Sequence, residues 1–193
     1  MITFDFKQDF EIDDALLINF VHLNQQQREV VRTWRNSEKI RKWMYTDHII
    51  SQAEHEKFLR DLEYSNTAFY WLVRMWDNDI GVLYFPHVDF RNKNAYFGIY
   101  SNPDSRILGV GKKLDMLAIK LLFERASFHS LWLEVIEDNK ISYLHKEMGF
   151  VEAGKLREFV QKENTWKNVV IMGLVRDEFL ELYGDHNKQQ RNS

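Results

Sequence analysis

Residues 106–113, with the sequence Arg-Ile-Leu-Gly-Val-Gly-Lys-Lys, join a strand predicted at 96–100 to an amphipathic helix predicted at 111–125. In such a junction, glycines let successive backbone N–H groups turn toward one anion, and the start of the helix carries a partial positive charge. Lys112 and Lys113 add two full charges. The segment therefore predicts a site for a pyrophosphate on a mixed α/β scaffold. Short glycine patterns also recur by chance, so an ordinary strand-to-helix connection is the alternative.

Length and composition limit the classes of protein to which the chain can belong. It has 193 residues, 45% of them hydrophobic and 15% aromatic, which suits one domain with a large core. We expect that domain to span residues 1–184 and the polar segment 185–193 to be disordered. A net charge of −3 provides no broad field for attracting nucleic acid or a membrane surface. No apolar run approaches the ~20 residues of a membrane helix, so we expect a cytoplasmic protein.

Few side chains are suited to metal binding or covalent catalysis. The sequence has no cysteine, which excludes disulfides, thiolate metal sites and a cysteine nucleophile. Its histidines lack metal-ligand spacing, so we predict no metal site. Any acyl chemistry would then proceed by direct transfer or through another nucleophile.

The hydrophobic pattern predicts about seven strands in one mixed, mostly antiparallel sheet flanked by helices, an α/β (α+β) class. Asn24 is a suitable N-cap for a first helix, and Ser51 and Glu54 have the spacing of a capping box before a second. The strand, helix and strand between 94 and 136 should form a parallel crossover. Strands are expected at 16–21, 68–76, 80–85, 94–100 and 131–136, a helix at 139–148, and a closing hairpin at 150–160 and 166–175.

Three motifs occur in order: Arg-x-x-Gly-x-Gly at 106–111, Asn139 before a helix, and Met148-Gly149-Phe150 after it. This combination resembles the GNAT superfamily of N-acetyltransferases, which depend on acetyl-coenzyme A (acetyl-CoA), and the resemblance covers nearly the whole chain. It implies a twisted sheet that is splayed between two central strands, here 96–100 and 131–136. It also implies acetyl-CoA as the acetyl-donor cosubstrate, with its pantetheine arm in the slot between those strands.

A narrower resemblance is carried by Trp34-Arg35-Asn36, Trp43-Met44-Tyr45, Phe97-Gly98-Ile99-Tyr100 and Leu133-Glu134-Val135. These segments look like the sugar-nucleotide acetyltransferases of pseudaminic acid biosynthesis, a pathway used to glycosylate flagellin. The resemblance implies acetylation of the 4-amino group of a UDP-linked 4-amino-4,6-dideoxy sugar by a monomer or homodimer. Acetylation of a protein N-terminus or a polyamine on the same scaffold is one alternative. A CoA-binding module without catalysis is another.

The GNAT resemblance also assigns the residues that would contact the cofactor. Backbone groups of Gly98, Ile99 and Tyr100 would bond the pantetheine amides as an added strand does, and an N–H there would hold the oxyanion. A fully paired strand is the alternative. For Asn139, the alternative is a simple helix cap. The remaining cofactor-binding candidates are Arg106, Leu108, Gly109, Val110, Gly111, Lys112 and Ser142.

Glu134 lies in an apolar run, on the same face as Trp132 and Ile136 if the strand is regular. Burial would raise its pKa, and a raised pKa suits a base that takes a proton from an ammonium group near neutral pH. The resemblance points to Glu134 as this base as well. A structural ion pair or a position at the sheet rim is the alternative.

Relatives usually place a tyrosine five residues before the Phe of the closing Gly-Phe pair, and its hydroxyl protonates the departing thiolate. His145 occupies that position here. A histidine can donate a proton near neutral pH, so His145 is the expected acid, with Tyr143 as the second candidate. A surface histidine without a catalytic role is the alternative.

Arg35, Met44 and Tyr45 are the main candidates for binding the sugar nucleotide. Arginine provides a forked donor for phosphate, and methionine and tyrosine can lie against uracil or a deoxy sugar. His87 is a further candidate, because it follows the predicted strand at 80–85. For Arg35, a solvated surface position is the alternative.

Overall fold

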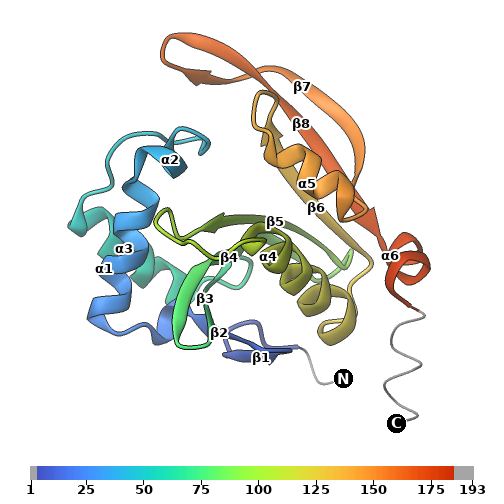
Figure 1. The fold of residues 1–193 in the computed structure, drawn as a ribbon, viewed down its shortest axis with the longest axis horizontal. Coiled ribbons are helices and arrows are strands. Elements are labelled where there is room, and N and C mark those ends of the chain that lie inside the picture. The colour runs from blue at the N-terminus through green and yellow to red at the C-terminus, as the bar shows by residue number, and fades with distance from the viewer. Residues whose placement is uncertain (1–3, 185–193) are drawn as a thin grey trace.

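The computed structural model describes residues 4–184, which form one open sheet of eight strands in the order β1-β2-β3-β4-β5-β6-β8-β7 (Figure 1). β5 and β6 are parallel and every other neighbouring pair is antiparallel, so the predicted mixed sheet and crossover are confirmed. The strand missing from the prediction is β1, because three residues give almost no alternation to detect. The predicted disorder of 185–193 lies outside the described residues. The strands are β1 (Phe10–Ile12), β2 (Ala15–Asn19), β3 (Phe69–Met75), β4 (Asn78–Asp89), β5 (Asn94–Ser101), β6 (Ser130–Ile136), β7 (Val151–Lys162) and β8 (Thr165–Val175).

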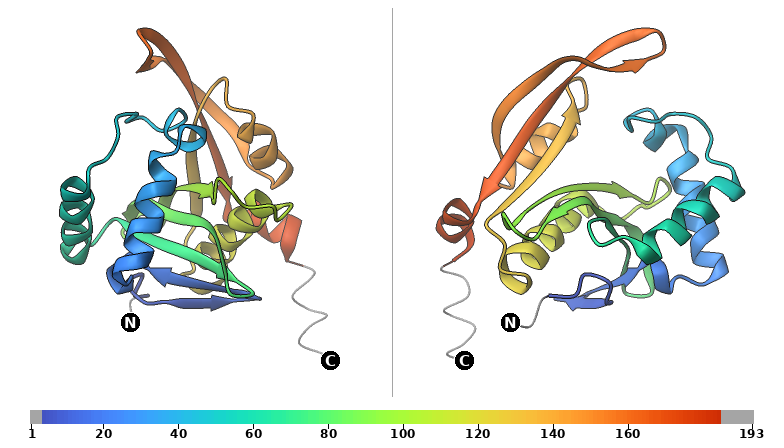
Figure 2. Two further views of the ribbon diagram at one scale, coloured as in Figure 1. Left: turned by 60° about the vertical axis from the view of Figure 1, so that its left-hand side comes forward. Right: turned by 180° about the vertical axis from the view of Figure 1, so that it is seen from behind.

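Helices cover both faces of the sheet (Figure 2). On one face, α1, α2 and α3 pack Val31, Ile40 and Leu59 against β2, β3 and β4. On the other face, α4 and α6 bury Leu114 and Phe179 in the larger core. The sequence analysis did not predict α2 or α6. The helices are α1 (Gln25–Asn36), α2 (Glu38–Arg41), α3 (Gln52–Tyr64), α4 (Val110–Ile119), α5 (Ile141–Glu147) and α6 (Arg176–Tyr183), with a 3₁₀ turn η1 (Phe20–His22) and a π-helical turn η2 (Lys120–Arg125) that continues α4.

Both predicted helix starts are confirmed by their caps. The Asn24 side chain accepts the backbone N–H of Gln27 at the start of α1, and Ser51 Oγ accepts that of Glu54 at the start of α3. Asn36, the last residue of α1, holds Ile50 through two hydrogen bonds of 2.8 and 2.9 Å. The contacts of Asn36 fix the C-terminal end of the segment 42–50, called here the 42–50 loop.

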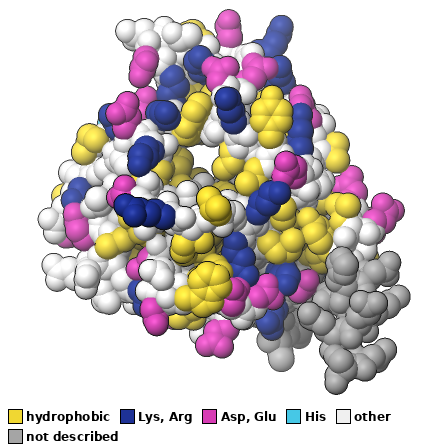
Figure 3. Space-filling model, in the orientation of Figure 1, with side chains coloured by type: hydrophobic (Ala, Val, Ile, Leu, Met, Phe, Trp, Pro, Cys, Tyr) yellow, Lys and Arg dark blue, Asp and Glu magenta, His cyan; other side chains and the backbone are white. Residues whose placement is uncertain are grey.

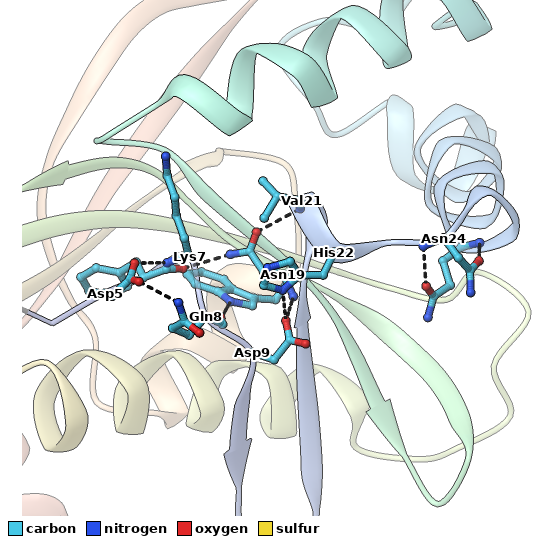
Figure 4. Close-up of polar contacts among 11 residues, drawn as sticks. Asp5, Lys7, Gln8, Asp9, Asn19, Val21, His22 and Asn24 are labelled. Carbon is cyan, nitrogen blue, oxygen red and sulfur yellow. Dashed lines mark hydrogen bonds and ion pairs between the residues drawn. The ribbon is translucent and has the colours of Figure 1, made fainter.

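The start of the described chain is fixed by a buried asparagine at the end of β2 (Figure 4). Asn19 Nδ2 donates to the Phe6 carbonyl at 2.9 Å, and Asn19 Oδ1 accepts the Val21 N–H at 3.1 Å. Asp9 accepts the Asn19 N–H and contacts His22 Nδ1 at 2.8 Å. The segment before β1 is thereby tied to the end of β2.

β5 and β6 pair over three residues only, Asn94–Tyr96 against Ser130–Trp132. Beyond Tyr96, β5 continues beside β4 and β6 continues beside β8, so the two central strands diverge. A β-bulge between Tyr84 and His87 of β4 lies opposite the same point. Because bulges bend and twist a strand, this one accounts for part of the divergence. The predicted splay is confirmed.

The β7–β8 hairpin extends beyond the body of the molecule as a long arm (Figures 1 and 2). Its two-residue turn, Glu163 and Asn164, has positive φ at both positions, as a tight hairpin turn requires. Lys162, next to this turn, donates to the carbonyls of Met44 and Tyr45 and forms an ion pair of 3.3 Å with Asp47. The arm therefore contacts the 42–50 loop and holds it over the sheet.

Candidate active site

A cavity of about 780 Å³ lies between the sheet, helices α1 and α3, and the 42–50 loop. Figure 3 shows this side of the molecule hollowed between the β7–β8 arm and the elements below it. The cavity reaches from α1 to the point where β5 and β6 diverge, since Gly98 and Glu134 are both in its wall. Nine of its 21 wall residues are Phe, Tyr or Trp, with Phe20, Phe58, Tyr70, Tyr84 and Tyr100 among them. We call it the aromatic cavity.

A cross-strand row of residues sets the floor of the aromatic cavity. Tyr70 on β3 pairs in register with Tyr84 on β4, which pairs with Gly98 on β5. The two tyrosine rings are stacked, with centroids 4.9 Å apart and planes at 3°. A Cβ at position 98 would lie 2.3 Å from the Tyr84 ring, so only glycine leaves room for that ring. Gly98 thus has a packing role in addition to its predicted backbone role.

Arg35 reaches into the aromatic cavity from α1. Its Nη2 donates to the backbone and side-chain oxygens of Thr46 at 2.9 and 3.0 Å. Its Nη1 is buried and has no hydrogen-bond partner among the described residues, and no carboxylate of that part of the chain forms an ion pair with the guanidinium. Burial lowers the pKa of Arg35 below its ordinary value, while Tyr100 and Tyr84 act in the opposite direction. The alternative of a solvated surface position is therefore wrong, and a buried cationic donor is available to an anion.

The 42–50 loop brings two more predicted residues to the aromatic cavity. The Tyr84 hydroxyl lies 3.9 Å from Met44 Sδ, within reach of a weak hydrogen bond. The Tyr45 hydroxyl donates to Glu134 Oε2. Burial, and secondarily this hydrogen bond, raise the pKa of Tyr45, so the phenol stays protonated. His87 is exposed and lies at the rim of the cavity, beyond the bulge of β4.

Glu134 is exposed, so the prediction that its strand position buries the carboxylate is wrong. The physical reason is the splay: past Trp132, β5 no longer lies beside β6, and this part of β6 borders the aromatic cavity instead of packed core. Tyr45 binds one carboxylate oxygen, and no hydrogen bond to Oε1 is found within residues 4–184. Glu134 therefore meets the geometric requirement for a base, an accessible oxygen beside the cavity.

The predicted anion site lies at the start of α4. Gly109 is the N-cap in the left-handed conformation, with φ of 77°, and no side chain caps this end of the helix. The space where a Gly109 Cβ would project is open, and Leu108 is 96% exposed. Because the first N–H groups of a helix have no partner within it, those of Val110, Gly111 and Lys112 are available to an anion.

The two lysines of this segment are not free charges. Lys112 forms an ion pair of 2.6 Å with Glu147 of α5, and Lys113 forms one of 2.5 Å with Asp14 in the turn after β1. Arg106 is exposed, before the start of α4. An anion would therefore meet mainly backbone N–H donors. Lys112 could also bind the anion by leaving Glu147, because both side chains of that ion pair are exposed.

Helix α5 carries the remaining predicted residues in three different environments. Asn139 Oδ1 accepts the Ile141 N–H at 3.1 Å, which is the local capping role given as the alternative. Tyr143 is 69% exposed, and Ser142 is half-buried. His145 is 4% exposed and contacts Asp115 of α4 through Nδ1, at 2.7 Å from Oδ2. The alternative of a surface histidine is therefore wrong.

These residues fit acetyl-CoA on their own geometry. The uncapped start of α4 suits the pyrophosphate, because no side chain within residues 4–184 caps its N–H groups and a Cβ at Gly109 would meet nothing within 4 Å there. The diverging edges of β5 and β6 leave backbone groups for the amides of the pantetheine arm, from Phe97 and Leu133 onward. Gly111 lies against Leu144 of α5, so the two helices meet beside the slot.

A family model described as "Acetyltransferase (GNAT) domain" matches residues 21–171. This chain belongs to the GNAT acetyltransferase family. It is an acetyl-CoA-dependent N-acetyltransferase, and acetyl-CoA is its acetyl donor. No helix within residues 4–184 of this GNAT acetyltransferase is long and apolar enough to cross a bilayer. The same residues hold no cluster of three acidic, His or Cys side chains that could bind a metal ion.

The acetyltransferase PseH of Campylobacter jejuni is 36% identical over 124 residues, which is 64% of this chain and 76% of that protein. Its structure with acetyl coenzyme A matches this GNAT acetyltransferase with a TM-score of 0.65 and 26% identity, over 84% of this chain and 99% of that one. The spermidine N-acetyltransferase of Vibrio cholerae in complex with CoA and spermine gives a TM-score of 0.79 at 22% identity, over 88% and 99% of the two chains. The latter likeness shows the fold alone.

Sequence reasoning missed three features of the site. Tyr70 and Tyr84 were not named, because their pairing with each other and with Gly98 depends on β-bulges that the local sequence pattern does not reveal. Asp115 was also missed, although it interrupts the apolar stripe of the helix at 111–125 and has no exposure. A charged residue at a buried position of a predicted helix is the signal that could have identified it.

Proposed function

We propose that this GNAT acetyltransferase acetylates the 4-amino group of a UDP-linked 4-amino-4,6-dideoxy sugar, in the cytoplasm, as a step of pseudaminic acid biosynthesis and flagellin glycosylation. The observation that carries the proposal is the unpaired Arg35 guanidinium in the aromatic cavity. A sugar nucleotide supplies both a phosphate for this cation and a flat base for the tyrosine rings. The narrower sequence resemblance supports the same acceptor, as does 36% identity with PseH against 22% with a spermidine acetyltransferase.

The charges of the aromatic cavity argue against a polyamine. A polycation would leave Arg35 unpaired and would add like charge beside it. Of the two carboxylates in the wall, Glu54 is already held by Ser51 at the start of α3 and by His48 at 3.2 Å. Glu134 is then the single wall carboxylate of the described chain that is available to an amine.

Each residue of the site has a chemical role in this proposal. Bound acetyl-CoA supplies an activated acetyl group as a thioester. Glu134 accepts a proton from the acceptor amine, directly or through water, and the Tyr45 hydroxyl orients its carboxylate. Backbone N–H groups near Gly98 face the diverging slot and can stabilise negative charge on a carbonyl oxygen. His145, or Tyr143 in its place, supplies the proton for the leaving sulfur.

The proposal is tested by measuring free thiol released from acetyl-CoA with three amines: a UDP-linked 4-amino-4,6-dideoxy sugar, a peptide N-terminus and spermidine. We expect kcat/KM for the sugar nucleotide to exceed that of the other amines at least about 100-fold, because a buried cation left unpaired costs a few kcal/mol. Preference for spermidine or for the peptide would overturn the acceptor assignment. Tight CoA binding without thiol release from any amine would favour a binding module.

A further inference from the structure

Asp115 and His145 form a buried pair on the α4 side of the sheet, opposite the aromatic cavity. Asp115 has no exposure and His145 has 4%, and Oδ2 lies 2.7 Å from Nδ1. The other carboxylate oxygen, Oδ1, is buried without a hydrogen-bond partner among the described residues. Burial raises the pKa of Asp115, and the hydrogen bond from His145 acts in the opposite direction.

This arrangement is costly for a purely structural contact. A buried carboxylate with an unpartnered oxygen loses its hydration without full compensation, and a well-packed apolar pair of similar volume is often no less stable. The surroundings add little polarity, because the imidazole ring packs edge-on against Phe97 and Phe150, with centroids 5.9 and 6.0 Å away. A pair of this kind is better explained by proton chemistry than by stability.

The hydrogen bond determines which ring nitrogen can exchange a proton. Nδ1 is occupied by Asp115, whereas Nε2 has no hydrogen-bond partner within residues 4–184. The pair can carry one proton more than a neutral imidazole beside an ionised carboxylate. That additional proton makes the ring an imidazolium, with Nδ1 protonated, or makes the carboxyl neutral, with Oδ2 protonated. Nε2 carries a hydrogen in both cases. Loss of the Nε2 proton then leaves a neutral imidazole with Nδ1–H bonded to an ionised Asp115.

The pair also lies next to the slot between the diverging strands. Phe97, which contacts the His145 ring, is the first residue of β5 beyond the pairing with β6 and precedes Gly98. Gly111, at the anion site of α4, contacts Leu144, the residue before His145. The imidazole therefore lies against the first residue of the slot and next to the helix contact that borders the predicted pyrophosphate site.

We infer that Asp115 is a positioning residue for His145 and that the pair protonates the sulfur leaving group. This inference rests on acetyl transfer in the proposed site, for any amine acceptor. As the carbon–sulfur bond breaks, sulfur keeps the bonding electrons and takes the Nε2 proton, and His145 becomes neutral. The proton lost by the amine leaves through Glu134 to water, and a proton from water restores the pair.

Other titratable groups near the pair are few. From α6, the hydroxyl of Tyr183 donates to the Met148 carbonyl at 3.0 Å, and the Asp115 charge contributes to its raised pKa. On α5 itself, Lys146 and Glu147 are exposed and pair with Glu152 and Lys112. Asp115 is therefore the one ionisable side chain that bonds the His145 ring within residues 4–184.

The test combines ¹⁵N NMR of the histidine rings in the ligand-free enzyme with steady-state kinetics of Asp115→Asn, which keeps the shape of the side chain. We expect the ¹⁵N resonances of the His145 ring to change, because the carboxylate that bonds Nδ1 is lost. The kcat should fall about 10-fold or more, and its decline at high pH should begin at lower pH, with the Kd for CoA unchanged. The control is Asp9→Asn, the same change in the exposed pair of Asp9 and His22, which should alter neither kcat nor its pH profile.

A second variant separates this role from folding. His145→Gln should retain the Kd for CoA and lose about 100-fold in kcat. The inference is overturned if Asp115→Asn leaves the ¹⁵N resonances of His145 and the pH profile of kcat unchanged, or if Tyr143→Phe alone abolishes turnover. The NMR measurement needs no acceptor, and the kinetics can use whichever amine gives thiol release. Failure of the sugar-nucleotide proposal can therefore be distinguished from failure of the inference about Asp115 and His145.

Discussion

Arg35 illustrates how a single residue can serve binding at the expense of stability. Its guanidinium is held by Thr46 through Nη2, while Nη1 is left without a partner in a largely apolar wall. Unpaired buried donors lower the free energy of unfolding, so selection for stability alone would not place an arginine there.

Replacement of Arg35 by methionine should therefore separate the two properties. We expect the KM of the acceptor to rise at least about 10-fold, the Kd of CoA to stay the same, and the free energy of unfolding to stay the same or rise by about 1 kcal/mol. Urea denaturation and steady-state kinetics measure these quantities. Arg28→Met on the same helix, whose guanidinium donates to the Leu23 carbonyl, is the control and should leave the KM unchanged. A loss of both stability and CoA affinity in Arg35→Met would contradict this view.

At the scale of strands, the row Tyr70, Tyr84 and Gly98 links sheet register to the shape of the aromatic cavity. Gly98→Ala places a Cβ 2.3 Å from the Tyr84 ring and must displace it. We expect the free energy of unfolding to fall by about 1–3 kcal/mol and the acceptor KM to rise. Gly154→Ala in β7, where the added Cβ meets nothing within 4 Å, should change stability by less than about 0.5 kcal/mol. Equal effects of the two variants on chemical denaturation would argue against the packing role.

The elements also show what a sequence can predict. Helix caps and strand alternation are local, so Asn24, Ser51 and the closing hairpin were predicted from neighbouring residues alone. The environment of Glu134 depends on where β5 leaves β6, and that of His145 depends on a partner 30 positions earlier in the chain. Such properties arise from long-range packing, and the local pattern at either residue does not contain them.

At the scale of the whole molecule, the β1–β5 and β6–β8 parts of the sheet are joined by three register pairs. A ligand between the diverging strands would connect these parts, so CoA should stabilise the native state beyond its contacts at α4. We expect CoA at 100 times its Kd to raise the free energy of unfolding by about 2.7 kcal/mol.

Hydrogen exchange locates that stabilisation. With CoA present, protection should increase at the amides of β5 after Tyr96 and of β6 after Trp132, and at the start of α4. The β1–β2 pair, at the opposite edge of the sheet, serves as the internal control. Added protection at that edge equal to that at the slot would contradict binding between the strands.

The contact of Lys162 with the 42–50 loop links two segments that are 118 residues apart. One wall of the aromatic cavity is thus held in place by the end of a hairpin whose strands have 12 and 11 residues. A hairpin shortened by one or two residue pairs would withdraw that support while leaving His145 and the anion site untouched. Exchange of hairpins of different length between related enzymes is therefore a direct route to engineering acceptor selectivity without altering the cofactor site.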